Sequence, residues 1–302
     1  MSTDTAATLG RRQNRLRLAA EALSQKLPTL LVEADRVAAT VVPGVHGRRR
    51  TGMGETFWQF RQYQAGDAAS SIDWRQSARS RHLFVREQEW EAAESVWLWC
   101  DLSDSMAFRS GASLPLKWER AALLMLALAG LLVRGGERVA FLGAGERPAT
   151  GRYGMETLVR CLVSAAADQR DSAAPLPPLP RHARLLLLSD FLLPIDQLTE
   201  RFGQFSGLGA RACLMQIVDP AEEELPYEGR VVFAGMEREG QALIDHVGGI
   251  RARYAELFRA HRETLAGIAG RQGWRFTSHR TDGTAERALL ALMGMLAPRI
   301  VA

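Results

Sequence analysis

A series of strand-length apolar segments separated by helical segments begins near residue 83, and it constrains the fold more than any other feature. Two of these segments, SVWLWC at 95–100 and LLLLS at 185–189, contain almost no polar residue. Strands of this composition are usually covered on both faces of a sheet. We therefore predict an α/β fold with a doubly wound, mostly parallel sheet, right-handed crossovers and helices on both faces.

The individual elements follow from the period of the apolar residues and from the turn residues between them. Residues 117–133 are apolar around most of the helix circumference, so we expect this helix to be buried. The other predicted helices span 155–167, 193–205, 250–271 and 285–296. The predicted strands span 83–91, 95–102, 136–143, 183–191, 210–220 and 274–279, with a hairpin formed by 230–235 and 241–247.

The residues before the alternating region form an N-terminal helical and irregular extension. Apolar residues recur at helical spacing over 16–39, with Pro28 as a predicted break. Residues 42–80 are rich in glycine and arginine, and they show no sustained period of either kind. We expect three parts: an N-terminal helical region at 1–40, a loop and strand segment at 41–94 that packs on the main domain, and the main domain at 95–302.

Cysteine usage and hydropathy indicate the compartment. Cys100, Cys161 and Cys213 lie in apolar runs without the spacing of a metal knuckle or a redox pair, so we expect buried, reduced residues. Residues 1–23 lack the apolar core of a signal peptide, and the longest apolar block, 123–133, is too short to cross a bilayer. We expect a cytoplasmic protein with no membrane span.

The net charge of +4 is small, but arginines gather at 11–17 and 48–50. Such an arm can contact nucleic acid, which would make retention on DNA or RNA steeply dependent on salt. A solvated arginine-rich face is the simpler interpretation, because no nucleic-acid-binding motif accompanies the arginines. Nucleic acid is therefore not an expected partner.

Carboxylates and hydroxyls gather where two predicted strands end. Asp101, Ser103 and Ser105 follow the strand SVWLWC, and Asp190 follows the strand LLLLS. Ligands of open parallel sheets bind beyond the carboxyl ends of the strands. If the turn after Asp101 is extended, Asp101, Ser103 and Ser105 point to one side, and Asp190 joins them if the two strands are neighbours. Oxygen ligands of this kind suit Mg²⁺.

Two interpretations of this cluster follow from the residues alone. A divalent cation held by these groups would keep an open coordination position, which favours an acidic group from a partner. Alternatively, the side chains cap backbone amides in a turn before a helix. With Asp190 present, we favour the metal or polar partner-binding site.

The cluster resembles the metal-ion-dependent adhesion site of von Willebrand factor A-like domains, whose D-x-S-x-S signature it carries. The upstream segment resembles the bacterial family called domain of unknown function 58. That family shows R-x-Y-x-x-G-D, then I-D-W-x-x-S-A-R, then V-R-E, and the resemblance covers roughly residues 44–297. The matching residues are Arg61, Tyr63, Gly66, Asp67, Ile72, Asp73, Trp74, Ser77, Ala78, Arg79, Val85, Arg86 and Glu87.

The resemblance implies a von Willebrand factor A-like, Rossmann-like fold with Mg²⁺ at Asp101, Ser103, Ser105 and Asp190. The adhesion site usually includes a threonine as well, and here Thr150 or Thr157 is available without a clear register.

The upstream motif has two interpretations. Its charged residues could form ion pairs that clamp a loop, with Trp58 and Trp74 as apolar surface, because buried charges are usually paired. We favour this clamp over a partner-binding face. The residues concerned are Arg61, Tyr63, Asp67, Asp73, Trp74, Arg79, Arg86 and Glu87.

The function implied is that of a non-enzymatic adaptor. Proteins of this family are associated with MoxR-type AAA+ ATPases in chaperone-like assembly or maturation of protein complexes, so we expect such an ATPase and a client protein as partners. The sequence has no G-x-x-x-x-G-K-[ST] loop for ATP hydrolysis of its own. The alternative is a Mg²⁺-dependent phosphotransferase or hydrolase with Asp101 as nucleophile, although Ser103 stands where such an enzyme needs a second carboxylate.

Overall fold

The computed structural model describes residues 25–40, 49–52, 56–64, 70, 72–80, 82–91, 94–168, 173–235 and 240–297. Only the backbone is described for 49–52, 56–61, 86–91 and 234. The chain divides into two compact units. One is Val45–Glu94, and the other combines Met1–Gly44 with Ser95–Ala302.

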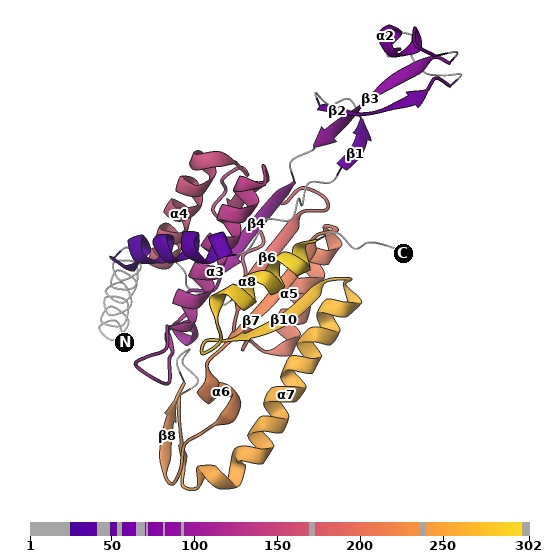
Figure 1. The fold of residues 1–302 in the computed structure, drawn as a ribbon. Coiled ribbons are helices and arrows are strands. Elements are labelled where there is room, and N and C mark those ends of the chain that lie inside the picture. Colours follow the sequence, from indigo (N-terminus) through magenta and orange to yellow (C-terminus); the bar gives the residue numbers. More distant parts are fainter. Residues whose placement is uncertain are drawn as a thin grey trace, which may run out of the picture. The chain divides into compact units, whose positions relative to one another are not determined.

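The larger unit contains a five-stranded parallel sheet in the order β10-β7-β6-β4-β5 (Figure 1). Its centre is the apolar strand that the sequence predicts to be covered on both faces, since Leu185 through Leu188 are each fully buried. The predicted α/β class and the mostly parallel sheet are therefore confirmed. The strands are β4 (Ser95–Cys100), β5 (Arg138–Phe141), β6 (Arg184–Ser189), β7 (Arg211–Val218) and β10 (Arg275–Arg280).

The order of the strands creates a switch point between β4 and β6. From β4 the chain passes to β5 on one side, and then returns to β6 on the other side of β4. This is the 2-1-3-4-5 order of a doubly wound sheet, in which ligands bind where the order reverses. Residues that follow β4 and β6 therefore lie side by side, and the N–H of Asp101 donates to the carbonyl of Leu188 at 2.8 Å.

Helices cover the sheet on both faces. The crossovers from β4 and from β6 run in opposite directions along the sheet, so right-handed connections place α3 and α5 on opposite faces. The helices α3 and α8 contact each other, as do α5 and α7. These helices are α3 (Lys117–Arg134), α4 (Gly151–Asp168), α5 (Ile195–Gly207), α7 (Val247–Arg271) and α8 (Ala285–Leu296).

A further helix, at residues 25–40, covers α3 and α8 from outside (Figure 1). Leu30, Ala34 and Val37 are buried in the core, Arg36 pairs with Glu286 of α8 at 3.2 Å, and Lys26 pairs with Glu119 of α3. The helix α3 thus lies between this helix and the sheet, which explains why it is apolar on nearly all sides. The predicted break at Pro28 is wrong, because the helix continues through it.

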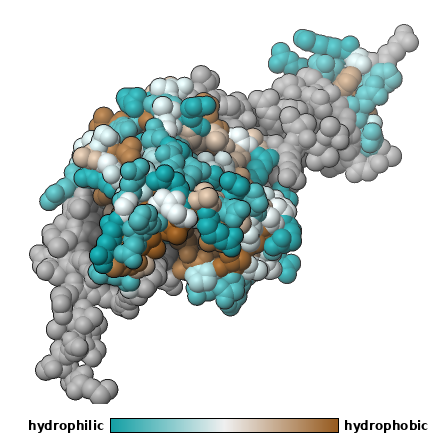
Figure 2. Space-filling model, turned by 90° about the horizontal axis from the view of Figure 1, so that it is seen from below, coloured by the Kyte–Doolittle hydropathy of each residue, from teal (hydrophilic) through white to brown (hydrophobic). Residues whose placement is uncertain are grey.

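Shorter elements complete the larger unit. The 3₁₀ helix η2 (Asp104–Ala107) and the short helix α6 (Pro220–Glu224) were not predicted, whereas the hairpin of β8 (Val231–Ala234) and β9 (Gln241–Ile244) is confirmed. All three cysteines are free and buried, as expected. The face seen in Figure 2 is mostly hydrophilic, with hydrophobic residues showing between the polar ones. No helix in the described part of the chain is long and apolar enough to span a membrane.

The smaller unit contains an antiparallel sheet in the order β1-β3-β2 and the one-turn helix α2. Residues 42–80 show no sustained period in the sequence, yet β1, β2 and α2 lie there. A bulge between Phe57 and Gln59 interrupts the period of two in β2, which conceals the strand in the sequence. The elements are β1 (Arg49–Gly52), β2 (Thr56–Gln62), α2 (Trp74–Ser77) and β3 (Phe84–Glu91).

Candidate functional site

Two carboxylates end the adjacent strands β4 and β6. Asp101 is fully buried, and both of its oxygens accept hydrogen bonds. Oδ1 accepts from the N–H of Ser103 at 2.9 Å, and Oδ2 accepts from Ser189 Oγ at 2.7 Å. Asp190 is also buried. The parallel pairing of the two strands therefore brings together residues almost ninety positions apart.

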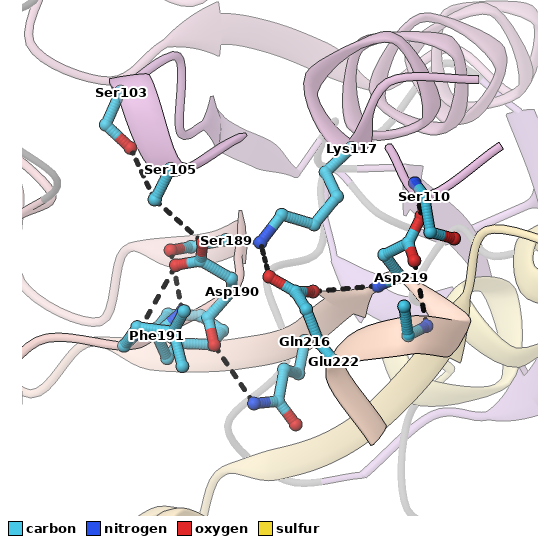
Figure 3. A network of polar contacts seen from close by, with 12 residues as sticks. Ser103, Ser105, Ser110, Lys117, Ser189, Asp190, Phe191, Gln216, Asp219 and Glu222 are labelled. Atoms are coloured by element: carbon cyan, nitrogen blue, oxygen red, sulfur yellow. Dashed lines mark hydrogen bonds and ion pairs between the residues drawn. The ribbon is translucent and has the colours of Figure 1, made fainter. Parts of the chain in front are cut away.

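Two hydroxyls connect these ends of the sheet (Figure 3). Ser103 Oγ lies 3.1 Å from Ser105 Oγ, and Ser105 Oγ donates to Asp190 Oδ2 at 2.8 Å. The structure thus brings together the four predicted oxygen-bearing residues. The predicted extended turn is wrong, because η2 follows directly and Ser103 is its N-cap residue. With this 3₁₀ turn, the Ser105 hydroxyl reaches Asp190 and the Ser103 hydroxyl lies against that of Ser105.

A buried lysine completes the cluster. Lys117, the first residue of α3, has no exposed surface, and its Nζ lies 2.9 Å from Asp190 Oδ2 and 2.5 Å from Glu222 Oε1 (Figure 3). Burial disfavours the ammonium charge, but Asp190 and Glu222 outweigh it and raise the pKa of Lys117. Burial raises the pKa of Glu222, against the opposing effect of Lys117.

Backbone N–H groups and one side-chain amide hold the acidic residues of the cluster in place. Asp219, fully buried at the end of β7, accepts from the N–H of Ser110 and of Ala221, each at 2.9 Å. Its own N–H donates to Glu222 Oε2 at 2.8 Å, so Asp219 both caps α6 and positions Glu222. Gln216 Nε2 donates to the carbonyl of Asp190 at 3.0 Å. The cluster therefore joins three strand ends and two helix starts.

The electrostatics of the cluster favour an added cation. Burial, followed by the charge of Asp190, raises the pKa of Asp101 to about 8, although bonds from Ser103 and Ser189 oppose the shift. The cluster contains four acidic side chains, Asp101, Asp190, Asp219 and Glu222, and one ammonium group, that of Lys117, which pairs with Asp190 and Glu222. Carboxylate and hydroxyl oxygens are the ligands that Mg²⁺ prefers.

The donor set fits a divalent cation of this type only if the serines act as ligands. Among the described residues, no group of three or more His, Cys, Asp or Glu side chains could hold a metal ion. Of the candidate threonines, Thr150 is exposed before α4 and Thr157 is buried within α4, and no hydrogen bond in the described chain joins them to the cluster.

The smaller unit holds the other predicted residues, and half of the side chains of the predicted clamp lie outside the described residues, so the clamp stays a prediction. Asp73 caps α2, since its Oδ1 accepts from the N–H of Gln76 at 2.9 Å. Trp74 is 64% exposed, and Arg79 is exposed with no ion pair to a described residue. Tyr63 is half-buried, and its N–H donates to the carbonyl of Leu83 at 2.8 Å. Asp67 and the side chains of Trp58, Arg61, Arg86 and Glu87 lie outside the described residues.

Sequence reasoning missed Lys117, Ser189, Gln216 and Glu222. A signal existed for the first, because Lys26 and Lys117 are the only lysines in the sequence, and Lys117 opens a helix that is otherwise almost entirely apolar. A cation at a helix N-terminus opposes the macrodipole, which indicates a specific anionic partner. The partners Asp190 and Glu222 are 73 and 105 residues away, and no local pattern connects them.

Comparison with known proteins identifies relatives and a family. The chain is similar to uncharacterized protein Rv1480 of Mycobacterium tuberculosis (strain ATCC 25618 / H37Rv), with 28% identity over 276 residues that cover 86% of this chain and 85% of that protein. Uncharacterized protein Mb1516 of Mycobacterium bovis (strain ATCC BAA-935 / AF2122/97) matches over the same lengths with the same identity.

Solved structures give a weaker likeness. Conserved hypothetical protein BatB from Bacteroides thetaiotaomicron matches with a TM-score of 0.38 and 15% identity, over 67% of this chain and 99% of that chain. An aerotolerance-related membrane protein from Bacteroides fragilis NCTC 9343 gives the same TM-score and identity, over 68% and 98%. Residues 59–264, more than half of the chain, match the family model described as protein of unknown function DUF58, and the chain belongs to that family.

Proposed function

We propose that this protein is a non-enzymatic interaction module with an adhesion-type cation site, similar to that of von Willebrand factor A-like domains. One observation carries the proposal: side-chain oxygens of Asp101, Ser103, Ser105 and Asp190 converge at the switch point of the sheet. Such an edge is where doubly wound folds bind ligands.

The residues that would hold Mg²⁺ are these four. Ser103 and Ser105 are half-buried and so remain accessible from the rim, whereas Asp101 and Asp190 are buried beneath them. The ion would supply a positive charge with an open position for an acidic group of a partner. The protein's own contribution is to fix the oxygens and to keep Lys117 as a permanent counter-charge for Asp190.

The arrangement of Asp101 argues against the alternative of a phosphotransferase or hydrolase. A nucleophilic carboxylate must reach the substrate, but Asp101 is fully buried, and Ser103 N–H and Ser189 Oγ each hold one of its oxygens. Lys117, which could otherwise bind a phosphate group, is buried between Asp190 and Glu222.

The partners of this module are proposals as well. The resemblance described in the sequence analysis implies a MoxR-type AAA+ ATPase as partner, in assembly or maturation of a client complex, and we propose that partner for this chain. The sequence lacks a phosphate-binding loop of the G-x-x-x-x-G-K-[ST] type, so energy from ATP would have to come from such a partner.

Magnesium titration of the purified protein tests the cation site. We expect Mg²⁺ to raise the melting temperature and to give a binding isotherm by calorimetry. Asp101→Asn and the Ser103→Ala/Ser105→Ala double variant should lose both responses. Asp104→Asn, which changes an exposed carboxylate on the same loop, is the matched control and should keep them. A wild type that shows no response to Mg²⁺ would contradict the site.

A second measurement tests the class of function. Binding of a purified MoxR-type ATPase should weaken with chelator and in Asp101→Asn. A screen with phosphate esters addresses the enzyme alternative: metal-dependent turnover that Asp101→Asn abolishes would replace the interaction module with a hydrolase.

A further inference from the structure

The smaller unit exposes a group of side chains at and near α2 that are not buried in its fold. We call Trp74, Arg75, Arg79, His82 and Leu83 the α2 corner. Trp74 is 64% exposed and Leu83 is 44% exposed, while Arg75, Arg79 and His82 are exposed and form no ion pair with a described residue. Exposed apolar residues that lie together, unlike those scattered singly, mark interaction sites.

Neighbouring residues of the same segment have clear structural tasks. Asp73 caps α2 through the N–H of Gln76. Ser77 is buried, and its Oγ donates to the carbonyl of Asp73 and accepts from the N–H of Phe84, both at 2.8 Å. The turn is therefore held by Asp73 and Ser77, and the side chains of Trp74 and Arg79 are held out from it without contributing to its hydrogen bonds.

The charge of the α2 corner is of one sign. Between Trp74 and Arg86 the sequence has no acidic residue, and the carboxylate of Asp73 is already used by the helix cap. Two arginines beside an exposed tryptophan combine the residue types that dominate binding energy at protein interfaces. A planar guanidinium group binds carboxylates through two parallel hydrogen bonds.

We propose that the α2 corner is a docking surface for an acidic segment of a partner protein, with an apolar side chain of that segment packed on Trp74 and Leu83. This surface contains no proposed metal ligand, so the inference is independent of the cation site.

A protein segment fits better than nucleic acid. Residues 45–94 contain eight arginines against seven acidic residues, so the unit lacks the broad positive surface that phosphate backbones need. Three of the acidic residues, Glu87, Glu89 and Glu91, lie in β3 of the same small sheet. Leu83 adds an aliphatic surface, which suits an apolar side chain better than a stacked base.

Fluorescence anisotropy with labelled peptides tests the proposal on the full chain. Three peptides of equal length share a central Leu-Phe pair and differ only in flanks of Glu, Gln or Lys, and a single-stranded DNA of matched charge is the fourth probe. We expect the Glu peptide to bind most tightly, with an affinity that falls as salt rises and does not change with chelator.

Variants locate the binding. Arg75→Glu/Arg79→Glu should lower the affinity for the Glu peptide by about tenfold or more, and Trp74→Ala should lower the affinity for all three peptides. Arg259→Glu, an exposed arginine of α7, is the matched control and should bind as the wild type does. Each variant should melt at the wild-type temperature, since the changed side chains are exposed.

Three outcomes would overturn the proposal. The first is no binding of the Glu peptide, and the second is binding of that peptide that persists in Arg75→Glu/Arg79→Glu. The third is that DNA binds more tightly than the peptides and that Arg75→Glu/Arg79→Glu abolishes the DNA binding. The last outcome would assign the surface to nucleic acid instead.

Discussion

The cluster at the end of β4 and β6 and the α2 corner are both rich in charge, but they use it in opposite ways. In the cluster, buried charges bind one another, as Lys117 does with Asp190 and Glu222. In the α2 corner, Arg75 and Arg79 are exposed and form no ion pair with a described residue. An unpaired charge is tolerable in water and costly in a core. In the first region the charged groups therefore stabilise the fold and position the site residues. In the second region, as proposed above, the charged groups are free to bind a partner.

Lys117→Met should produce the largest effect. It leaves the carboxylates of Asp190 and Glu222 facing each other without a counter-charge, which costs about 3–5 kcal/mol of unfolding free energy. Urea denaturation measures the loss. Lys26→Met, which removes a half-exposed lysine that pairs with Glu119, should cost about 1 kcal/mol or less. Equal losses in the two variants would contradict the central role of Lys117.

His279 should make the protein sensitive to acid. Burial and then the neighbouring Arg120, whose Nη1 lies 3.3 Å from His279 Nε2, lower the pKa of this residue to about 4. Because the folded pKa lies below the unfolded value, the stabilisation is complete above about pH 6.5 and is lost as the pH falls toward 4. The full loss is about 3 kcal/mol.

His279→Gln should therefore flatten the dependence of unfolding free energy on pH between 6.5 and 4. His82→Gln, an exposed histidine, should leave it as in the wild type. A slope in His279→Gln identical to that of the wild type would show that other groups cause the acid sensitivity.

Ser77→Ala should have a smaller effect, confined to the unit Val45–Glu94. It removes the acceptor for the N–H of Phe84 and the donor to the carbonyl of Asp73, at a cost of about 1–2 kcal/mol. Hydrogen exchange at the amide of Phe84 should accelerate accordingly. Ser80→Ala, at an exposed position, should cost only a few tenths of a kcal/mol, and similar exchange in the two variants would contradict the role of Ser77.

Trp74→Ala should have the smallest effect on stability. The side chain is 64% exposed, so we expect a change within about 0.5 kcal/mol in urea denaturation, even though peptide binding weakens. A loss of several kcal/mol would show that Trp74 is a structural residue, and the contrast between the two regions would disappear.

Local patterns predicted most elements of the larger unit. The strands of the sheet and the helices from residue 117 onward have the apolar period that burial on one or both faces requires. The same reasoning failed for β1, which has only four residues, and for β2, in which a bulge interrupts the period of two. Side-chain period indicates a strand only where the strand is long enough and regular enough for the period to repeat.

The sequence by itself determined the alternation of strands and helices and the polar residues that end two of the strands. Only the tertiary structure decided that β4 and β6 are neighbours, which places Asp101 beside Asp190, and that Lys117 and Glu222 join them. The physical reason is the distance along the sequence over which each kind of interaction acts. Periodicity and capping act over a few residues, whereas the pairing of a buried charge depends on which distant segments the sheet order brings into contact.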